Sequence, residues 1–429
     1  MVVMSLYNVI DRIFIGQGVG TEAIAGLAIT FPVMNVSAAL GVLIGAGAAA
    51  RISIMLGAND HHSAEKVLGN SLVLTIVFGV AYITLFALFL DPILRAFGAS
   101  DATLPYARDF IGTLLPGLLL TNIAFSFNNI MRASGYPVRA MVTMFIGAGV
   151  NVILAPIFIF LLDMGIKGAA IATDLSMLCS AIFVMGHFVK PDTRLKFTRG
   201  IYRLEWAIVW GIISIGAAPS LVNFASSIIN VLINRSLVTY GSDLAVAAAG
   251  IFTTYTSLIV MVVIGICQGL QPIIGYNYGA GRYDRLKGVY YLAVGWSTIV
   301  VTVGCVVGVL WPHLIARAFT VDPELIAVTS KAFSIGMVVF WCVGFQIVST
   351  TFFQSIGQAF KSIILSLCRQ VLFLIPLLWI LPPMLGLDGV WVSFPISDTI
   401  ATVVTAILII VQLRHLPHHL TLKEKEMIR

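Results

Sequence analysis

Charge is scarce in this sequence. Only 10% of its 429 residues are Asp, Glu, Lys or Arg, whereas 59% are hydrophobic. A soluble domain carries about a quarter charged residues, so the depletion along the whole chain excludes a soluble globular protein. Apolar stretches of about 20 residues or more recur instead, long enough to cross a hydrocarbon core of about 30 Å as helices. Because these stretches are continuously apolar rather than alternating, they also exclude a β-barrel. We therefore expect an all-α integral membrane protein.

Patterns for metals, disulfides and enzymatic chemistry are missing as well. The five cysteines all fall within apolar stretches, which makes a disulfide framework outside the membrane unexpected. No stretch contains an HExxH motif or a Ser/His constellation of the kind that an intramembrane enzyme needs. The chain is therefore not expected to be an enzyme or to carry a cofactor.

Twelve apolar stretches follow one another along the chain and predict twelve transmembrane helices. They lie near residues 1–18, 23–56, 64–91, 105–132, 139–162, 165–189, 206–239, 244–276, 286–316, 325–353, 360–384 and 387–412. The polar segment between the sixth and seventh predicts an N-terminal lobe (1–189), a linker (190–205), a C-terminal lobe (206–412) and a tail (413–429).

Lys and Arg are concentrated on one side of these helices, including the linker and the tail. The positive-inside rule makes that side cytoplasmic, so both termini are expected in the cytoplasm of a multi-pass protein of the cell (inner) membrane. The net charge of +6 follows from the same rule and does not indicate nucleic acid binding.

The two sets of six helices are related by an internal repeat. Gly57 of "LGANDHHSAEK" aligns with Gly279 of "YGAGRYDRLKG", an offset of 222 (279 − 57), and Gly135 aligns with Gly357 at the same offset. With a one-residue gap, Gly168 of "MGIKG" aligns with Gly389 of "LGLDG". Because each repeat holds an even number of helices, both have the same orientation, which is the parallel type of transporter repeat.

The repeat also predicts that the first helix is short at its beginning. The seventh helix begins near Trp206, and subtracting the offset gives position −16 (206 − 222), so roughly 17 residues of the second half have no counterpart in the first. We expect the chain to lack the start of helix 1, with a naturally short first helix as the alternative.

Polar side chains at depth in the membrane are expensive and are functional candidates by default. Asp11 is a lone carboxylate in the first stretch, three residues after Asn8, so the two share a helix face. It can bind a proton or, with neutral oxygens around it, Na⁺; an interfacial carboxylate that only orients the helix is the alternative. Arg369 and Asp398 could instead form a purely structural pair. The cavity and substrate candidates are Asn8, Met34, Asn128, Met177, Asn230, Arg369 and Asp398.

Several blocks of the sequence resemble one transporter family. "YNVIDRIFIG", "GVNVILAPIFIF", "GIKGAAIAT", "QGLQPIIGYNYGA" and "GLDGVWVSFPISD", in this order and spacing, are similar to the multidrug and toxic compound extrusion (MATE) family and to its DinF/MepA-like branch. The resemblance implies twelve helices in two lobes, with a coupling ion, H⁺ or Na⁺, bound in the N-terminal lobe.

That resemblance also implies the residues of the ion site. Asp11 matches the family's helix 1 aspartate, Asn151 its helix 5 asparagine and Thr173 its helix 6 threonine, so Na⁺ could bind at these three. The helix 5 aspartate of the family falls on Ala155 here. Asp174, which follows Thr173 directly, could restore the second charge, although on a helix it points about 100° away from Thr173.

The function that we expect from this resemblance is cation-coupled export of amphipathic, often cationic compounds by alternating access, by a monomer in the lipid bilayer. One alternative is a flippase for a lipid-linked precursor, a relative in the same superfamily. A flippase needs several cations in a large cavity, whereas the deep cations here are few, chiefly Arg235 and Arg369.

Overall fold

The computed structural model describes residues 21–97, 99, 101 and 103–416. These residues contain helices and turns but no strand, as the apolar stretches predict. The predicted first helix, with Asn8 and Asp11, lies outside the described residues. By its internal contacts the chain divides into two compact units, one up to Ser220 and one from Leu221.

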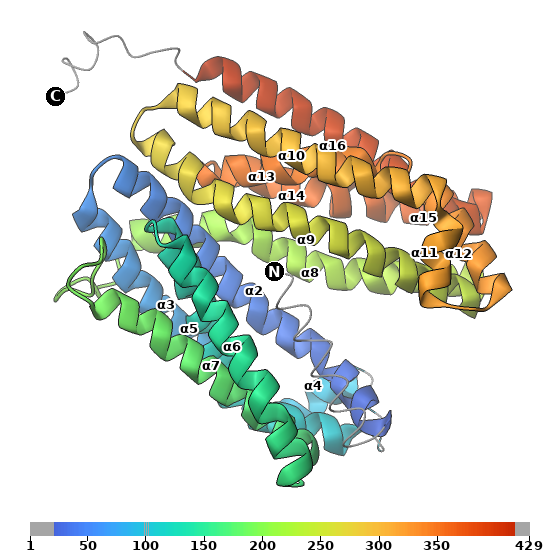
Figure 1. Cartoon of the computed structure of the whole chain (residues 1–429), viewed down its shortest axis with the longest axis horizontal. Helices are drawn as coiled ribbons and strands as arrows, with labels where there is room; N and C mark the ends of the chain where they lie inside the picture. The colour runs from blue at the N-terminus through green and yellow to red at the C-terminus, as the bar shows by residue number, and fades with distance from the viewer. Residues whose placement is uncertain (1–20, 98, 100, 102, 417–429) are drawn as a thin grey trace. The chain divides into compact units, whose positions relative to one another are not determined.

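The first unit is a helical bundle that ends within the long helix α8. Figure 1 shows α2, α3, α5, α6 and α7 packed side by side, as their contacts also require. Its elements are α2 (Thr21–Gly57), α3 (His61–Leu88), α4 (Leu90–Ala96), α5 (Leu104–Ala133), α6 (Pro137–Pro156), the π-helical turn η1 (Ile157–Leu161), α7 (Gly165–Val189) and the first half of α8 (Trp206–Tyr240).

The second unit has the same all-helical character. Its elements are the rest of α8, α9 (Asp243–Gly279), α10 (Tyr283–Leu310), α11 (Pro312–Phe319), α12 (Pro323–Gly336), the 3-10 turn η2 (Phe340–Cys342), α13 (Val343–Ser355), α14 (Ala359–Leu367), the π-helical turn η3 (Cys368–Leu374), α15 (Ile375–Leu385) and α16 (Leu387–His415). Within it, α9 packs against α10, α12 and α13.

Ten helices among the described residues are long and apolar enough to span a membrane, and a bent pair raises the number to eleven. They correspond to the second to twelfth predicted helices. The bent pair occupies the predicted span 325–353, where α12 and the following η2–α13 segment meet at 56°. At this break the Met337 carbonyl accepts hydrogen bonds from the Phe340 N–H at 3.0 Å and from Cys305 Sγ of α10 at 2.9 Å, so α10 contacts the backbone where the helix is interrupted.

The repeat is visible in the backbone at its turns. Three pairs of residues adopt left-handed φ angles: Asn59 (62°) and Gly281 (65°), Gly135 (98°) and Gly357 (78°), Gly165 (55°) and Gly386 (61°). The members of the first two pairs are 222 positions apart, and those of the third 221 apart (386 − 165), as the sequence alignment with its single gap predicts. Equivalent turns therefore end equivalent helices in the two halves.

The predicted linker is fastened to α3 rather than extended. The buried Asn70 donates from Nδ2 to the carbonyls of Ile201 (3.3 Å) and Arg203 (3.0 Å) and accepts at Oδ1 from the Glu205 N–H (3.0 Å). Lys66 adds an ion pair to Glu205 at 2.8 Å. We call this arrangement the Asn70 clasp.

The first half of α8 approaches α2 closely within the first unit. A Cβ atom on Gly47 would lie 1.9 Å from the Ile212 carbonyl oxygen, and one on Gly216 would lie 1.7 Å from that of Leu43. Only glycine fits at both positions, because small residues let two helix backbones approach this closely. The first unit therefore extends into α8, whereas the predicted lobe boundary lies in the linker; the lobe boundaries stay a prediction of the repeat.

Candidate functional site

The polar residues expected in the N-terminal lobe meet between α6 and α7. Asn151 is 1% exposed and its Nδ2 donates to the Thr173 hydroxyl at 3.2 Å. Thr173 in turn donates to the Ala169 carbonyl one turn earlier, at 3.0 Å. The two side chains thus form one buried hydrogen-bonded pair, which joins α6 to α7, the next long helix along the chain.

Ala155, one turn after Asn151, brings no oxygen to this pair. It is fully buried in an apolar cluster that also contains Ile159, Ala169 and Ala172. The neutral oxygens of Asn151 and Thr173 thus have no carboxylate from position 155 beside them. Asp11 lies outside the described residues, so its distance from the pair is not part of this geometry.

Asp174 faces a different helix from its neighbour Thr173. Its carboxyl group lies against α5, where a Cβ atom on Gly117 would come within 1.6 Å of Asp174 Oδ1. Gly117 therefore makes the space that this carboxyl group occupies. Asp174 Oδ1 is buried and has no hydrogen-bond partner among the described residues, an unusual state because buried polar atoms are nearly always paired.

Sequence reasoning missed Gly117. The only local signal is its place directly after Pro116 in α5, since Pro116 has no N–H to donate and interrupts the hydrogen-bond ladder of the helix. Nothing in the sequence alone links this position to Asp174, 57 residues later (174 − 117).

The cavity candidates of the first unit have varied surroundings. Asn128 is buried and donates to the Ala140 carbonyl at 2.7 Å, joining α5 to α6. Met34 on α2 accepts a weak contact from Thr30 Oγ1 at 4.0 Å. Met177 is half-buried on α7, one turn after Thr173.

The second unit holds a buried ion pair at the π-helical turn η3. Arg369 Nε lies 2.5 Å from Asp398 Oδ1, and Asp398 is only 2% exposed. The backbone around the pair is also bonded: Ser397 Oγ donates to the Arg369 carbonyl, and Gln346 Nε2 donates to the Asp398 carbonyl at 2.7 Å. Gln346 is a further member that the sequence did not single out. Asn230, by contrast, is exposed on α8.

The described residues contain no group of three or more His, Cys, Asp or Glu side chains that could hold a metal ion. The candidates therefore consist of two separate places: the Asn151–Thr173 pair with Asp174 nearby in sequence, and the Arg369–Asp398 pair.

Buried polar groups within membrane-spanning helices and an internal repeat are together typical of secondary transporters. The family comparison agrees: the MatE family model matches residues 1–157 and 219–380, and the chain belongs to the MatE family. Members of this family are transporters and not enzymes. The resemblance read from the sequence is thus confirmed.

Individual relatives are similar over nearly the full chain. The multidrug export protein MepA of Staphylococcus aureus is 28% identical over 99% of this chain and 92% of its own length, and that of Staphylococcus haemolyticus is 26% identical over 96% and 90%. A MATE crystal structure in the bent conformation has a TM-score of 0.91 at 28% identity, covering 96% of this chain and 92% of its own. A MOP superfamily transporter from Pyrococcus furiosus has a TM-score of 0.90 at 28% identity, covering 98% and 94%.

Proposed function

We propose that this protein is a cation-coupled multidrug exporter of the cell membrane, which takes amphipathic, often cationic compounds out of the cytoplasm by alternating access. Family membership and the similarity to proteins named multidrug export protein support the substrate class. The orientation that we propose places both termini in the cytoplasm, following the distribution of Lys and Arg, and the protein acts as a monomer.

The buried, unpartnered Oδ1 of the half-buried Asp174 is the observation that carries the coupling proposal. A buried carboxylate oxygen without a hydrogen-bond partner makes the ionised form costly, and a bound proton or cation lowers that cost. Binding of the proton or cation shifts the balance between inward- and outward-open states only if the two states differ in affinity for that ion.

We assign the coupling ion as H⁺, taken up at Asp11 and Asp174. The position that carries a further aspartate in the family holds the buried Ala155, and Asp174 lies against α5 rather than beside the Asn151–Thr173 pair. Each of the two carboxyl groups therefore takes up its own proton, which needs no further ligands. Na⁺ at Asp11, Asn151 and Thr173 is the alternative, since carbonyl and hydroxyl oxygens suit a hard cation.

A lipid flippase is not favoured, because such a protein needs several free cations in its cavity. The charge of the deep Arg369 is already engaged by Asp398 at 2.5 Å.

Dye efflux from membrane vesicles tests the proposal, with the pH and sodium gradients collapsed separately. We expect efflux to stop when the pH gradient is collapsed and to continue without Na⁺. Asp11→Asn and Asp174→Asn should each reduce efflux by at least tenfold. Asp109→Asn is the matched control, because Asp109 pairs with Lys167 on an exposed surface at 3.2 Å. Full activity in both test variants, or dependence on Na⁺ alone, would contradict the assignment.

A further inference from the structure

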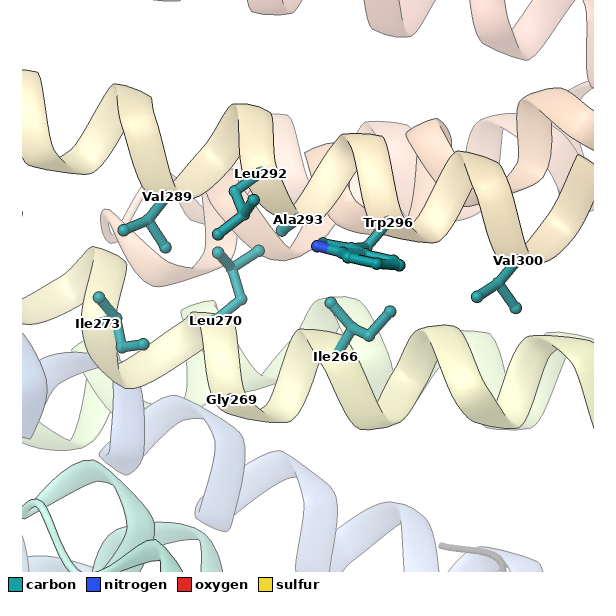
Figure 2. Close-up of a pocket in the computed structure, with 9 residues that line it drawn as sticks. All are labelled: Ile266, Gly269, Leu270, Ile273, Val289, Leu292, Ala293, Trp296 and Val300. Carbon is teal, nitrogen blue, oxygen red and sulfur yellow. The ribbon is translucent and has the colours of Figure 1, made fainter.

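An apolar groove runs between α9 and α10 in the second unit. Figure 2 shows the indole of Trp296 from α10 between the two helices, with Ile266 and Leu270 of α9 facing it. The groove has a volume of about 370 Å³, and all nine residues that line it are apolar or glycine. Leu292 and Trp296 are 62% and 58% exposed, so in the membrane this groove is open to lipid.

The length of the groove matches one leaflet of a bilayer. Its α10 side runs from Val289 to Val300, which is about 16 Å at 1.5 Å per residue. Half of a hydrocarbon core is about 15 Å. A single acyl chain that lies along the groove therefore reaches from the leaflet's surface to the middle of the membrane.

A cation continues the same face of α10 beyond the end of the groove. Arg285 is one turn before Val289, about 6 Å further along the axis; an acyl chain that fills the groove would therefore have its headgroup near Arg285. It lies in register with the lining residues of α10, which are Val289, Leu292, Trp296 and Val300.

Arg285 is also available for an anion. It is exposed, and it forms no ion pair with any residue that the structure describes. Lys287 carries the same charge close by, but it is about 200° round the helix from Arg285. Asp284 is the nearest carboxylate in sequence and is about 100° away from Arg285 round the helix. On α9, the half-exposed Tyr276 follows Ile273 toward this end, and tyrosine favours the membrane interface.

We propose that this groove binds an anionic phospholipid, with one acyl chain between α9 and α10 and the phosphate at Arg285. In the orientation proposed above, the lipid belongs to the cytoplasmic leaflet. The match of apolar length and cationic end distinguishes this occupant from a second protein copy, which needs no unpaired arginine at the headgroup depth.

Tryptophan quenching by brominated lipids tests the proposal directly, because Trp296 forms part of the wall. The protein is reconstituted in phosphatidylcholine that contains 10% of a lipid brominated on its chains, either phosphatidylglycerol or phosphatidylcholine. The contribution of Trp296 among the seven tryptophans is the difference between the wild type and Trp296→Phe. We expect brominated phosphatidylglycerol to quench this contribution at least threefold more than brominated phosphatidylcholine does.

Two variants and two matched controls separate the groove from general lipid contact. Gly269→Leu fills the groove, since a Cβ atom there meets nothing within 4 Å, and Arg285→Gln removes the charge; both should abolish the preference. Gly250→Leu is the control for Gly269→Leu: a Cβ atom at Gly250 also meets nothing within 4 Å, and Gly250 lies about 28 Å from Gly269 along α9. Lys287→Gln is the control for Arg285→Gln, because it removes a charge from another face of α10. Both controls should keep the preference. Equal quenching by the two lipids in the wild type, or a preference that survives Gly269→Leu and Arg285→Gln, would overturn the proposal.

Discussion

At the scale of single residues, the position of the Asp174 carboxyl group depends on the missing side chain of Gly117. Gly117 leaves the space that the carboxyl group occupies, and a methyl group there would lie 1.6 Å from Asp174 Oδ1. A helix interior normally disfavours glycine by about 1 kcal/mol relative to alanine, so this position departs from what helix propensity alone selects. Close packing against Asp174 explains the departure.

Gly117→Ala should therefore lower stability and efflux together. The overlap with Asp174 should cost about 1–3 kcal/mol, as overpacking of a buried site does, and should displace the carboxyl group. Thermal unfolding in detergent and dye efflux measure the two effects. In an Asp174→Ala background the stability loss should disappear, because the clashing group is gone.

Gly149→Ala is the matched control, since a Cβ atom at Gly149 on α6 meets nothing within 4 Å. It should be neutral or slightly stabilising. An equal loss from Gly117→Ala with and without Asp174 would show that the two residues do not compete for space.

At the scale of elements, polar groups fasten segments that the sequence presents as independent. The Asn70 clasp holds the linker against α3 through three inter-segment hydrogen bonds, and the Arg369–Asp398 pair joins η3 to α16. Both use buried side chains, where an unpaired partner is far more costly than the bond is favourable.

Asn70→Leu should release the linker. Loss of the amide leaves the carbonyls of Ile201 and Arg203 without their donor, which should cost about 1–3 kcal/mol. Trypsin should then cleave at Lys196, Arg199 and Arg203 at least tenfold faster, as gel electrophoresis over time will show. Lys66→Gln removes only the half-exposed ion pair to Glu205, worth at most about 1 kcal/mol, and should leave cleavage nearly unchanged. Equal protection of the linker in Asn70→Leu and the wild type would refute the clasp.

Arg369→Leu should be among the most destabilising single changes in the second unit. It leaves Asp398, which is 2% exposed, without its counter-charge, a loss of about 3–5 kcal/mol. The double variant Arg369→Leu/Asp398→Leu should recover most of this stability in thermal unfolding, because no buried charge remains. If the double variant is as stable as the wild type but exports no dye, the pair serves transport as well as structure. A double variant no more stable than Arg369→Leu would mean that the pair is not the source of the loss.

At the scale of the whole molecule, the repeat could be predicted from the sequence because turns need particular residues. Gly135 and Gly357 stand where φ is positive, and the offset between them was visible without a structure. The helices themselves follow from long apolar runs, which need no knowledge of their neighbours. The break after Gly336 and the space beside Gly117 could not be predicted, because each depends on contacts with a distant helix, and periodicity within one segment carries no such information.

Equivalent turns should accept each other's residues. Gly281→Asn places at φ 65° the residue that its counterpart Asn59 already carries at φ 62°, and asparagine tolerates this region. The change should alter stability by less than about 0.5 kcal/mol, whereas Gly281→Val should cost more than about 1 kcal/mol, because a β-branched residue is strained there. Thermal unfolding of the two variants measures the contrast. Equal loss from both would mean that Gly281 is needed for space rather than for its backbone angle.

The close approach of α2 and α8 at Gly47 and Gly216 means that the boundary of the sequence repeat and the boundary of the packed unit differ. The sequence repeat predicts that α8 is the first helix of the second half, yet by contact its first 15 residues, up to Ser220 (220 − 206 + 1), belong to the first unit. A cut at the repeat boundary separates the start of α8 from the surface of α2 against which it packs. Co-expressed halves cut within residues 190–205 should therefore associate, because the second fragment contains the start of α8, whose Gly216 packs closely against α2 of the first fragment.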